Sequence, residues 1–157
     1  MKRTGIQILV FVLSVFLIMA CDKNRIYDQY LPIEKTGWDK DSLLVFDFPV
    51  SDTMQNHNLY INVRNDIKYK YSNLWLFLTI DEPGGTELTD TFEITLADPS
   101  GKWLGEGFGG IKTRQAIFKR DIYFPASGDY AIRVQHGMRE NILMGITDIG
   151  VRLEKQE

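Results

Sequence analysis

The sequence is poor in the residues that form disulfides and bind zinc. It has one cysteine, Cys21, and two histidines, His57 and His136, among 157 residues. A lone cysteine cannot form an intramolecular disulfide, and structural zinc sites use three or four Cys or His ligands. We therefore expect a domain without disulfides and without structural zinc.

Regularly spaced calcium ligands are also missing. Calcium takes oxygen ligands from loops, and Asp81, Glu82, Glu87 and Asp90 are the available cluster of carboxylates. They lack the D-x-D-x-D-G spacing of a calcium loop, so ordinary solvated acidic residues are the favoured interpretation. We predict no bound metal and no cofactor.

The apolar run near the start of the sequence is too short to cross a bilayer. It extends from Ile6 to Met19, whereas a membrane span needs roughly 20 apolar residues. Lys2 and Arg3 precede it, and charged residues follow from Asp22 onward. This pattern is typical of a secretory signal peptide, which we assign to residues 1–20.

The end of this run carries the single cysteine. Ile18-Met19-Ala20-Cys21 resembles the bacterial lipobox, in which a small residue precedes a cysteine that is acylated after cleavage. One fourteen-carbon chain binds membranes only marginally, whereas two or three chains anchor a protein stably. We therefore predict that Cys21 carries the lipid and that acyl chains on it attach the protein to a membrane.

A basic surface is missing as well. Removal of residues 1–20 takes away Lys2 and Arg3, which leaves 16 basic and 21 acidic residues and a net charge of −5. The remaining basic residues are scattered, and nucleic-acid binding needs a basic face. We expect no nucleic-acid partner.

What the sequence has in abundance is strand patterning. Apolar residues alternate with polar ones in at least five segments, and turn residues such as Asp98-Pro99-Ser100-Gly101 separate them. The alternating segments are 44–50, 59–64, 92–96, 130–135 and 149–153. Short strands at this spacing indicate an all-β fold, a single antiparallel β-sandwich of about eight strands, jelly-roll-like or Ig-like, over residues 42–157.

Two segments depart from this pattern. Residues 73–80, "NLWLFLTI", are almost wholly apolar, which predicts a strand buried on both faces or in the middle of a sandwich, with Trp75 in the core. Residues 21–41 mix charges with aromatic residues, and we interpret them as a lipidated tether. The aromatic residues are too many for a free linker, so part of this tether is expected to dock on the domain or on a partner.

Catalytic signatures are weak. Gly105, Gly107 and Gly110 satisfy G-x-G-x-x-G, but the amphipathic helix that a dinucleotide site requires is missing, and a bulged strand or a close sheet crossing explains the glycines better. A G-x-S-x-G elbow is absent. We predict no catalytic residues and a protein that is not an enzyme.

Several residues are candidates for contact with a ligand or partner. His136 ends a core strand, so it is either a buried histidine or part of a pocket, and Trp38 ends the tether against the domain. Trp103 lies beside glycines and could stack on a sugar, although core packing is the more frequent role of tryptophan. Phe108, Ile111 and Phe118 fit the strand pattern least well and could form an exposed apolar patch.

The last strands carry a resemblance to a known family. "SGDYAIRVQHGMRENILMGITDIGVRLEK" at 127–155, "YDQYLPI" at 27–33 and the lipobox resemble the GldH family of gliding-motility lipoproteins of Bacteroidota. The resemblance implies a small all-β envelope lipoprotein that belongs with the gliding apparatus and the associated type IX secretion system. It implies no catalytic residues, and Cys21 is the only functional position that carries over.

The resulting hypothesis is a non-enzymatic lipoprotein that supports gliding or type IX secretion through contacts with envelope proteins. The alternative is a glycan-binding lipoprotein of a polysaccharide-utilisation system. The resemblance also bears on orientation. It implies that the signal for surface display in this phylum is a cluster of acidic residues soon after the cysteine. Lys23 and Arg25 interrupt any such cluster. We therefore expect the protein to face the periplasm, on the inner or the outer membrane.

Overall fold

The computed structural model describes residues 23–156, and within them every regular element is a β-strand. These residues include no helix that is long and apolar enough to cross a bilayer. The strands are β1 (Arg25–Pro32), β2 (Trp38–Asp39), β3 (Leu44–Val50), β4 (His57–Asp66), β5 (Asn73–Asp81), β6 (Glu87–Thr95), β7 (Ile111–Ile122), β8 (Gly128–His136), β9 (Ile142–Leu143) and β10 (Ile146–Lys155).

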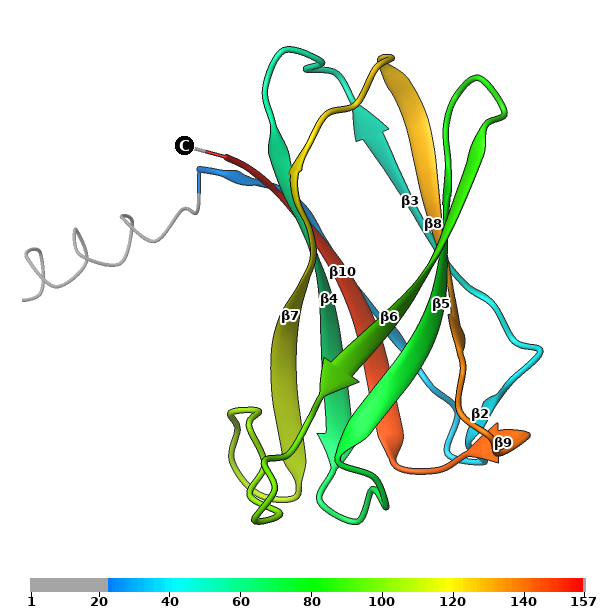
Figure 1. Ribbon diagram of the computed structural model, residues 1–157, viewed down its shortest axis with the longest axis vertical. Coiled ribbons are helices and arrows are strands. Elements are labelled where there is room, and N and C mark those ends of the chain that lie inside the picture. The colour runs from blue at the N-terminus through cyan, green and yellow to red at the C-terminus, as the bar shows by residue number, and fades with distance from the viewer. Residues whose placement is uncertain (1–22, 157) are drawn as a thin grey trace, which may run out of the picture.

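The strands form two antiparallel four-stranded sheets that pack face to face (Figure 1). One sheet has the order β1-β10-β4-β7 and the other β3-β8-β5-β6, while β2 and β9 make a small ladder at one end. Among the long strands, β1 pairs with β10, β3 with β8, β4 with β7 and β5 with β6. This nested order of pairs is that of a long hairpin rolled into a jelly roll. The expected all-β sandwich is confirmed.

Alternating side chains build the core between the sheets. Phe46, Phe48 and Val50 of β3 point inward and are buried, whereas Asp47 and Pro49 between them are exposed. Strand β4 contributes further buried apolar residues from the opposite sheet. Each such side chain gains about 1.5–3 kcal/mol from burial, which fixes the register of the strands because a slip by one residue would expose the whole set.

Strand β5 lies inside its sheet, between β8 and β6, but it is not buried on both faces. Leu74, Leu76 and Leu78 are fully buried, but Trp75 is 39% exposed and Phe77 is 45% exposed. A two-layer sandwich buries one face of each sheet, so the alternate residues of β5 point outward. The prediction that Trp75 lies in the core is therefore wrong.

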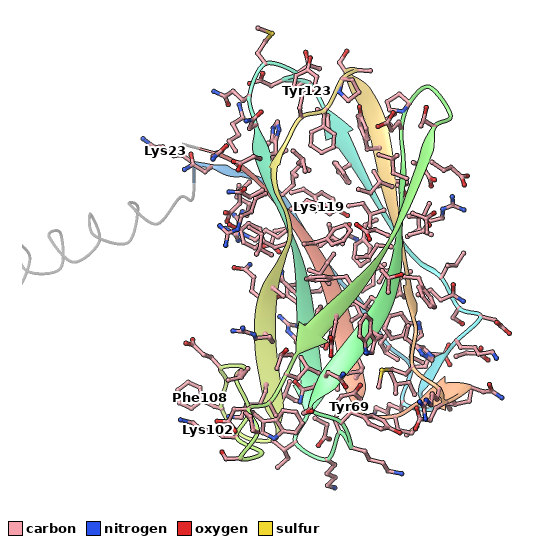
Figure 2. The ribbon with its side chains drawn as sticks, in the orientation of Figure 1. Lys23, Tyr69, Lys102, Phe108, Lys119 and Tyr123 are labelled. Atoms are coloured by element: carbon pink, nitrogen blue, oxygen red, sulfur yellow. The ribbon has the colours of Figure 1, made fainter. Side chains whose placement is uncertain are left out.

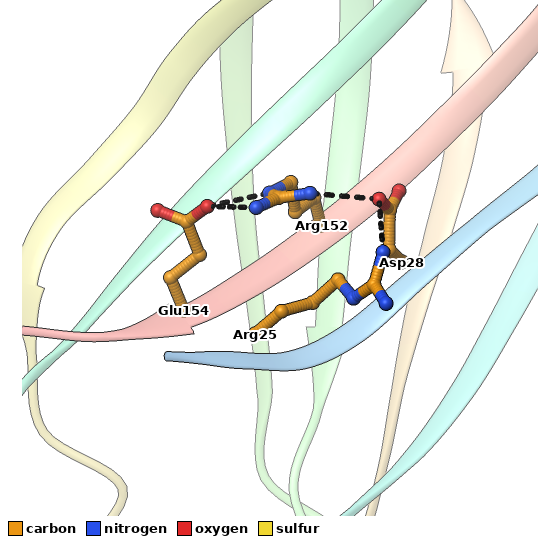
Figure 3. A network of polar contacts seen from close by, with 4 residues as sticks. All are labelled: Arg25, Asp28, Arg152 and Glu154. Carbon is orange, nitrogen blue, oxygen red and sulfur yellow. Dashed lines mark hydrogen bonds and ion pairs between the residues drawn. The ribbon is translucent and has the colours of Figure 1, made fainter. Parts of the chain in front are cut away.

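The segment expected to be a tether contributes a strand to the domain. Strand β1 runs along β10 from Arg25 opposite Glu154 to Pro32 opposite Asp148. The Arg152 side chain lies between the carboxylates of Glu154 and Asp28, 2.9 Å from the latter, and Arg25 approaches the same oxygen of Asp28 (Figure 3). Residues from Arg25 onward thus belong to the folded domain, which starts before the expected boundary at residue 42.

Candidate functional site

Trp38 and His136, two of the candidate contact residues, meet inside the core. Their rings pack edge to face with centroids 5.3 Å apart, and both side chains are almost fully buried. The His136 Nε2 atom lies 3.0 Å from the Trp38 carbonyl oxygen, so a neutral ring with its proton on Nε2 donates to that oxygen. The Trp38 Nε1–H donates to the Ser42 carbonyl oxygen. Both residues have structural roles here and are inaccessible to a partner.

Burial of the two histidines makes the domain sensitive to acid. Desolvation lowers the pKa of His57 and of His136 below the usual value. The folded chain therefore binds fewer protons than the unfolded chain. The free energy of unfolding has its full value above about pH 6.5 and falls as the pH drops below it. We expect a lower urea midpoint at about pH 5.5 than at about pH 7.5.

Three aspartates do not contribute to this pH dependence, and NMR can follow the two histidines directly. Hydrogen bonds lower the pKa values of Asp52, Asp90 and Asp98, so these groups stay ionised over that range. The ring carbon resonances of His57 and His136, followed by NMR, should show both rings neutral at a pH where an exposed histidine is half protonated. Titration of both rings near pH 6.5 would contradict the prediction.

The three residues predicted to form one apolar patch are separated in the structure. Ile111 begins β7 and Phe118 lies seven residues further along it, a separation of about 23 Å in an extended strand. The Phe118 ring is partly buried against the core and lies 5.2 Å from the Phe92 ring, beside the ion pair of Lys119 with Asp90. Phe118 therefore packs between the edges of the two sheets, and Ile111 is borderline exposed.

Phe108 is displayed alone at one end of the sandwich (Figure 2). Its side chain is fully exposed at the tip of the glycine-rich loop that precedes β7. Reciprocal backbone hydrogen bonds between Glu106 and Thr113 fix this loop, and a Cβ on Gly105 would lie 2.9 Å from the Thr113 carbonyl oxygen. These contacts explain the glycines by close approach of two backbones. Trp103, at the start of the same loop, is partly buried against the core.

Sequence reasoning missed the main exposed aromatic surface, which lies on the outer face of β5. Trp75 and Phe77 project from alternate positions of this strand, and the Gly137 N–H donates to the Trp75 carbonyl oxygen. A Cβ on Gly137 would lie 3.1 Å from two carbons of the Phe77 ring, so this ring lies over the glycine. We call Trp75, Phe77 and Gly137 the β5 surface. The unbroken apolar run of residues 73–80 was the one sequence signal for this surface.

Polar groups surround the β5 surface. Gln135 lies opposite Phe77 in the neighbouring strand, and Asn73 donates to the Glu93 carboxylate beside Trp75. Farther along the sheet, the Arg133 guanidinium contacts both Asp81 and Glu87, at 2.6 and 2.9 Å. Exposed aromatic residues inside a polar rim are the usual composition of a protein interface. In the part of the chain that the structure describes, no group of three or more His, Cys, Asp or Glu side chains is placed to hold a metal ion.

The chain matches one protein family along most of its length. The family model described as GldH lipoprotein matches residues 25–153. "Gliding motility lipoprotein GldH homolog" from Christiangramia forsetii is 38% identical and the match covers 99% of both chains. "Gliding motility lipoprotein GldH" from Flavobacterium johnsoniae is 35% identical, over 99% of this chain and 98% of the relative.

Among solved structures, a family GH115 4-O-methyl-α-glucuronidase has 11% identity and a TM-score of 0.42. The match covers 88% of this chain but 19% of that enzyme, and it carries no functional weight. The two full-length relatives carry the same family name as the family model, and all three matches extend over most of the chain. This chain therefore belongs to the GldH lipoprotein family.

Proposed function

We propose that this lipoprotein is a non-catalytic component of the cell envelope that supports gliding through contacts with other envelope proteins. Cys21 carries the acyl chains, the domain faces the periplasm, and the partners belong to the gliding apparatus or the associated type IX secretion machinery. The names of both relatives support the gliding role. Lys23 and Arg25 interrupt the acidic residues after Cys21, which supports the periplasmic orientation.

The observation that carries the proposal is the exposure of Trp75 and Phe77 on the β5 surface. Large aromatic side chains contribute nothing to core packing when they point outward from a sandwich, and they dominate the binding energy of protein interfaces. Two of them lie on one strand, over a glycine that leaves them room. This arrangement fits a partner protein that covers the β5 surface with its own apolar side chains.

Replacement of both aromatic residues tests this role. A chain with Trp75→Thr and Phe77→Thr should fold, because threonine favours strands and neither side chain lies in the core. Loss of two central aromatic residues typically weakens an interface by more than about 2 kcal/mol, or roughly thirtyfold in affinity. Cells that carry this variant in place of the native chain should fail to spread on agar.

Val45→Thr is the matched control, because Val45 is also an exposed apolar residue on the outer face of the same sheet and lies outside the β5 surface. It should spread normally. The level of each variant in the membrane fraction is measured by immunoblot, so that loss of protein is not mistaken for loss of contact. Normal spreading by the double variant at normal abundance would refute the role of the β5 surface.

Glycan binding is the alternative function, and one observation favours it. Trp75 lines a shallow groove with Tyr71, Asn73, Arg139 and Glu140. An exposed aromatic face beside hydrogen-bonding side chains also suits a sugar ring. Saturable, polysaccharide-dependent quenching of tryptophan fluorescence that is lost in Trp75→Thr would favour this alternative over a protein partner.

A further inference from the structure

The described chain begins at one end of the sandwich, where four strands of one sheet are aligned. The Asn24 carbonyl oxygen accepts a hydrogen bond from the Lys155 N–H, Lys155 lies opposite His57, and His57 lies opposite Ile122. The loop of residues 51–56 leads into His57, and Tyr123 follows Ile122. We call this loop and Tyr123, together with Lys23 and Asn24, the anchored end.

The sequence allows very little slack between the anchored end and the lipid. Asp22 and Lys23 are the only residues between Cys21 and Asn24. An extended chain spans at most about 3.6 Å per residue, so the Cα atoms of Cys21 and Asn24 are at most about 11 Å apart. An acylated Cys21 lies at the bilayer interface. Asn24, where the chain enters the anchored end, is therefore held close to the headgroups.

Strand β1 cannot lengthen this connection without loss of native contacts. It pairs with β10 from Arg25 to Pro32, with one irregularity between Arg25 and Tyr27, and the Arg152 side chain links it to β10 through Asp28 (Figure 3). To gain slack, the chain would have to peel from an edge of the sheet, breaking backbone hydrogen bonds and this ion pair. The native fold and the lipid position are therefore coupled through the first residues of β1.

The anchored end also exposes side chains suited to a lipid surface. Met54 is 88% exposed at the tip of its loop, and Tyr123 is 58% exposed after β7. Tyrosine is favoured at membrane interfaces because it has an apolar ring and a polar tip, and Lys23 adds an exposed positive charge. Figure 2 places Lys23 and Tyr123 toward one end and Phe108 and Lys102 at the other.

We propose that the anchored end rests on the lipid bilayer, with Met54 and Tyr123 at the headgroups, and that the opposite end points away from it. The inference rests on acylation of Cys21 in the proposed function. Strand β7 spans about 36 Å between Ile122 at the anchored end and Ile111, so Phe108 stands at least one sandwich length from the lipid. Because β4 ends and β5 begins at that far end, Trp75 also lies well away from the bilayer.

The single cysteine makes a direct test simple. After acylation of Cys21 no free thiol remains in the mature chain, so Met54→Cys and Phe108→Cys each introduce one site for a fluorescent label. Both positions are exposed at loop tips, which makes them a matched pair. The acylated proteins are reconstituted in phosphatidylethanolamine vesicles with a minority of phosphatidylglycerol and of a lipid that carries a nitroxide on its headgroup.

The label at position 54 should lose most of its fluorescence to the nitroxide, and the label at position 108 should lose almost none. Equal quenching at the two positions, or stronger quenching at 108, would overturn the proposal. A second variant inserts a flexible Gly/Ser linker of about a dozen residues between Asp22 and Lys23, which adds roughly 20 Å of root-mean-square reach. Quenching at position 54 should then fall sharply, and unchanged quenching would show that the short connection does not hold this end on the lipid.

Failure of this inference is distinguishable from failure of the proposed function. Mass spectrometry of the purified protein reports first whether Cys21 is acylated. An unacylated chain would remove the anchor itself and, with it, both proposals in their present form. An acylated chain with equal quenching at positions 54 and 108 would overturn only the orientation, and the spreading assay of the β5 surface would be unaffected.

Discussion

Cells in which Cys21→Ala replaces the native chain are expected to lose spreading on agar completely. The substitution removes the atom that would be acylated, so the precursor is neither processed nor attached through lipid. Stable attachment needs two or three acyl chains at about 0.8 kcal/mol per buried methylene, and no other described feature supplies that energy. Mass spectrometry of the membrane fraction should find no lipidated peptide that begins at residue 21.

The domain itself should be unaffected by this change. Cys21 precedes β1, and the contacts that hold β1 in the sheet come from residues 25–32. The soluble domain from residue 21 onward, made with either cysteine or alanine at position 21, should therefore unfold at the same urea concentration. Its export behind the signal peptide of a soluble periplasmic protein is the matched control, because it supplies folded protein without an anchor.

Two results would contradict this expectation. Spreading at the native level by the Cys21→Ala chain would show that the lipid is dispensable, and so would spreading by the soluble periplasmic domain. Release of type IX cargo, measured by mass spectrometry of the culture medium, tests the secretion part of the proposal separately. Cargo release that stays normal while spreading is lost would confine the role to gliding.

The core was predictable from sequence because one face is buried in the strands that build it. In residues 44–50 and 57–66 the buried positions alternate with less buried ones, and this period of two is visible without any knowledge of partners. Pairing between strands distant in sequence was not visible. Asp28 and Arg152 are 124 positions apart, and their contact helps to decide that residues 25–32 form a strand.

The edge position of β1 explains why its segment resembled a tether. None of its residues is fully buried, so the alternation that reveals a strand is weak. Its stability comes from backbone hydrogen bonds to β10 and from ion pairs on the surface of the sheet. Local patterns report burial, and an edge strand has little of it.

The β5 surface was hidden by the opposite effect. An unbroken apolar run predicts burial on both sides, and apolar residues kept outward for a partner give the same run as residues buried by a second layer. Leu74 and Leu76 face the opposite sheet, whereas among the described residues no further layer covers the face of β5 that carries Trp75 and Phe77. Only the structure shows this difference. A surface that serves a partner therefore resembles a core in sequence.

Trp38→Ala should be the most destabilising tryptophan substitution in this chain, lowering the free energy of unfolding by about 3–5 kcal/mol. The Trp38 side chain is almost fully buried, packs on His136 and donates to the Ser42 carbonyl oxygen. Alanine would leave a cavity and an unpaired carbonyl group. A domain of this size is stable by about 5–15 kcal/mol, so the loss is a large part of the total.

Trp75→Ala is the control, because Trp75 projects from the outer face, and it should cost less than about 1 kcal/mol. Urea unfolding of the soluble domain, followed by far-ultraviolet circular dichroism, measures both values. Trp38 lies in the segment between β1 and β3 that sequence patterns assign to a tether. If Trp38→Ala cost no more than Trp75→Ala, this segment would not be part of the cooperative core. The expected difference of several kcal/mol instead makes the segment a structural link, so that a lipid at Cys21 holds the whole sandwich and not a loosely attached end.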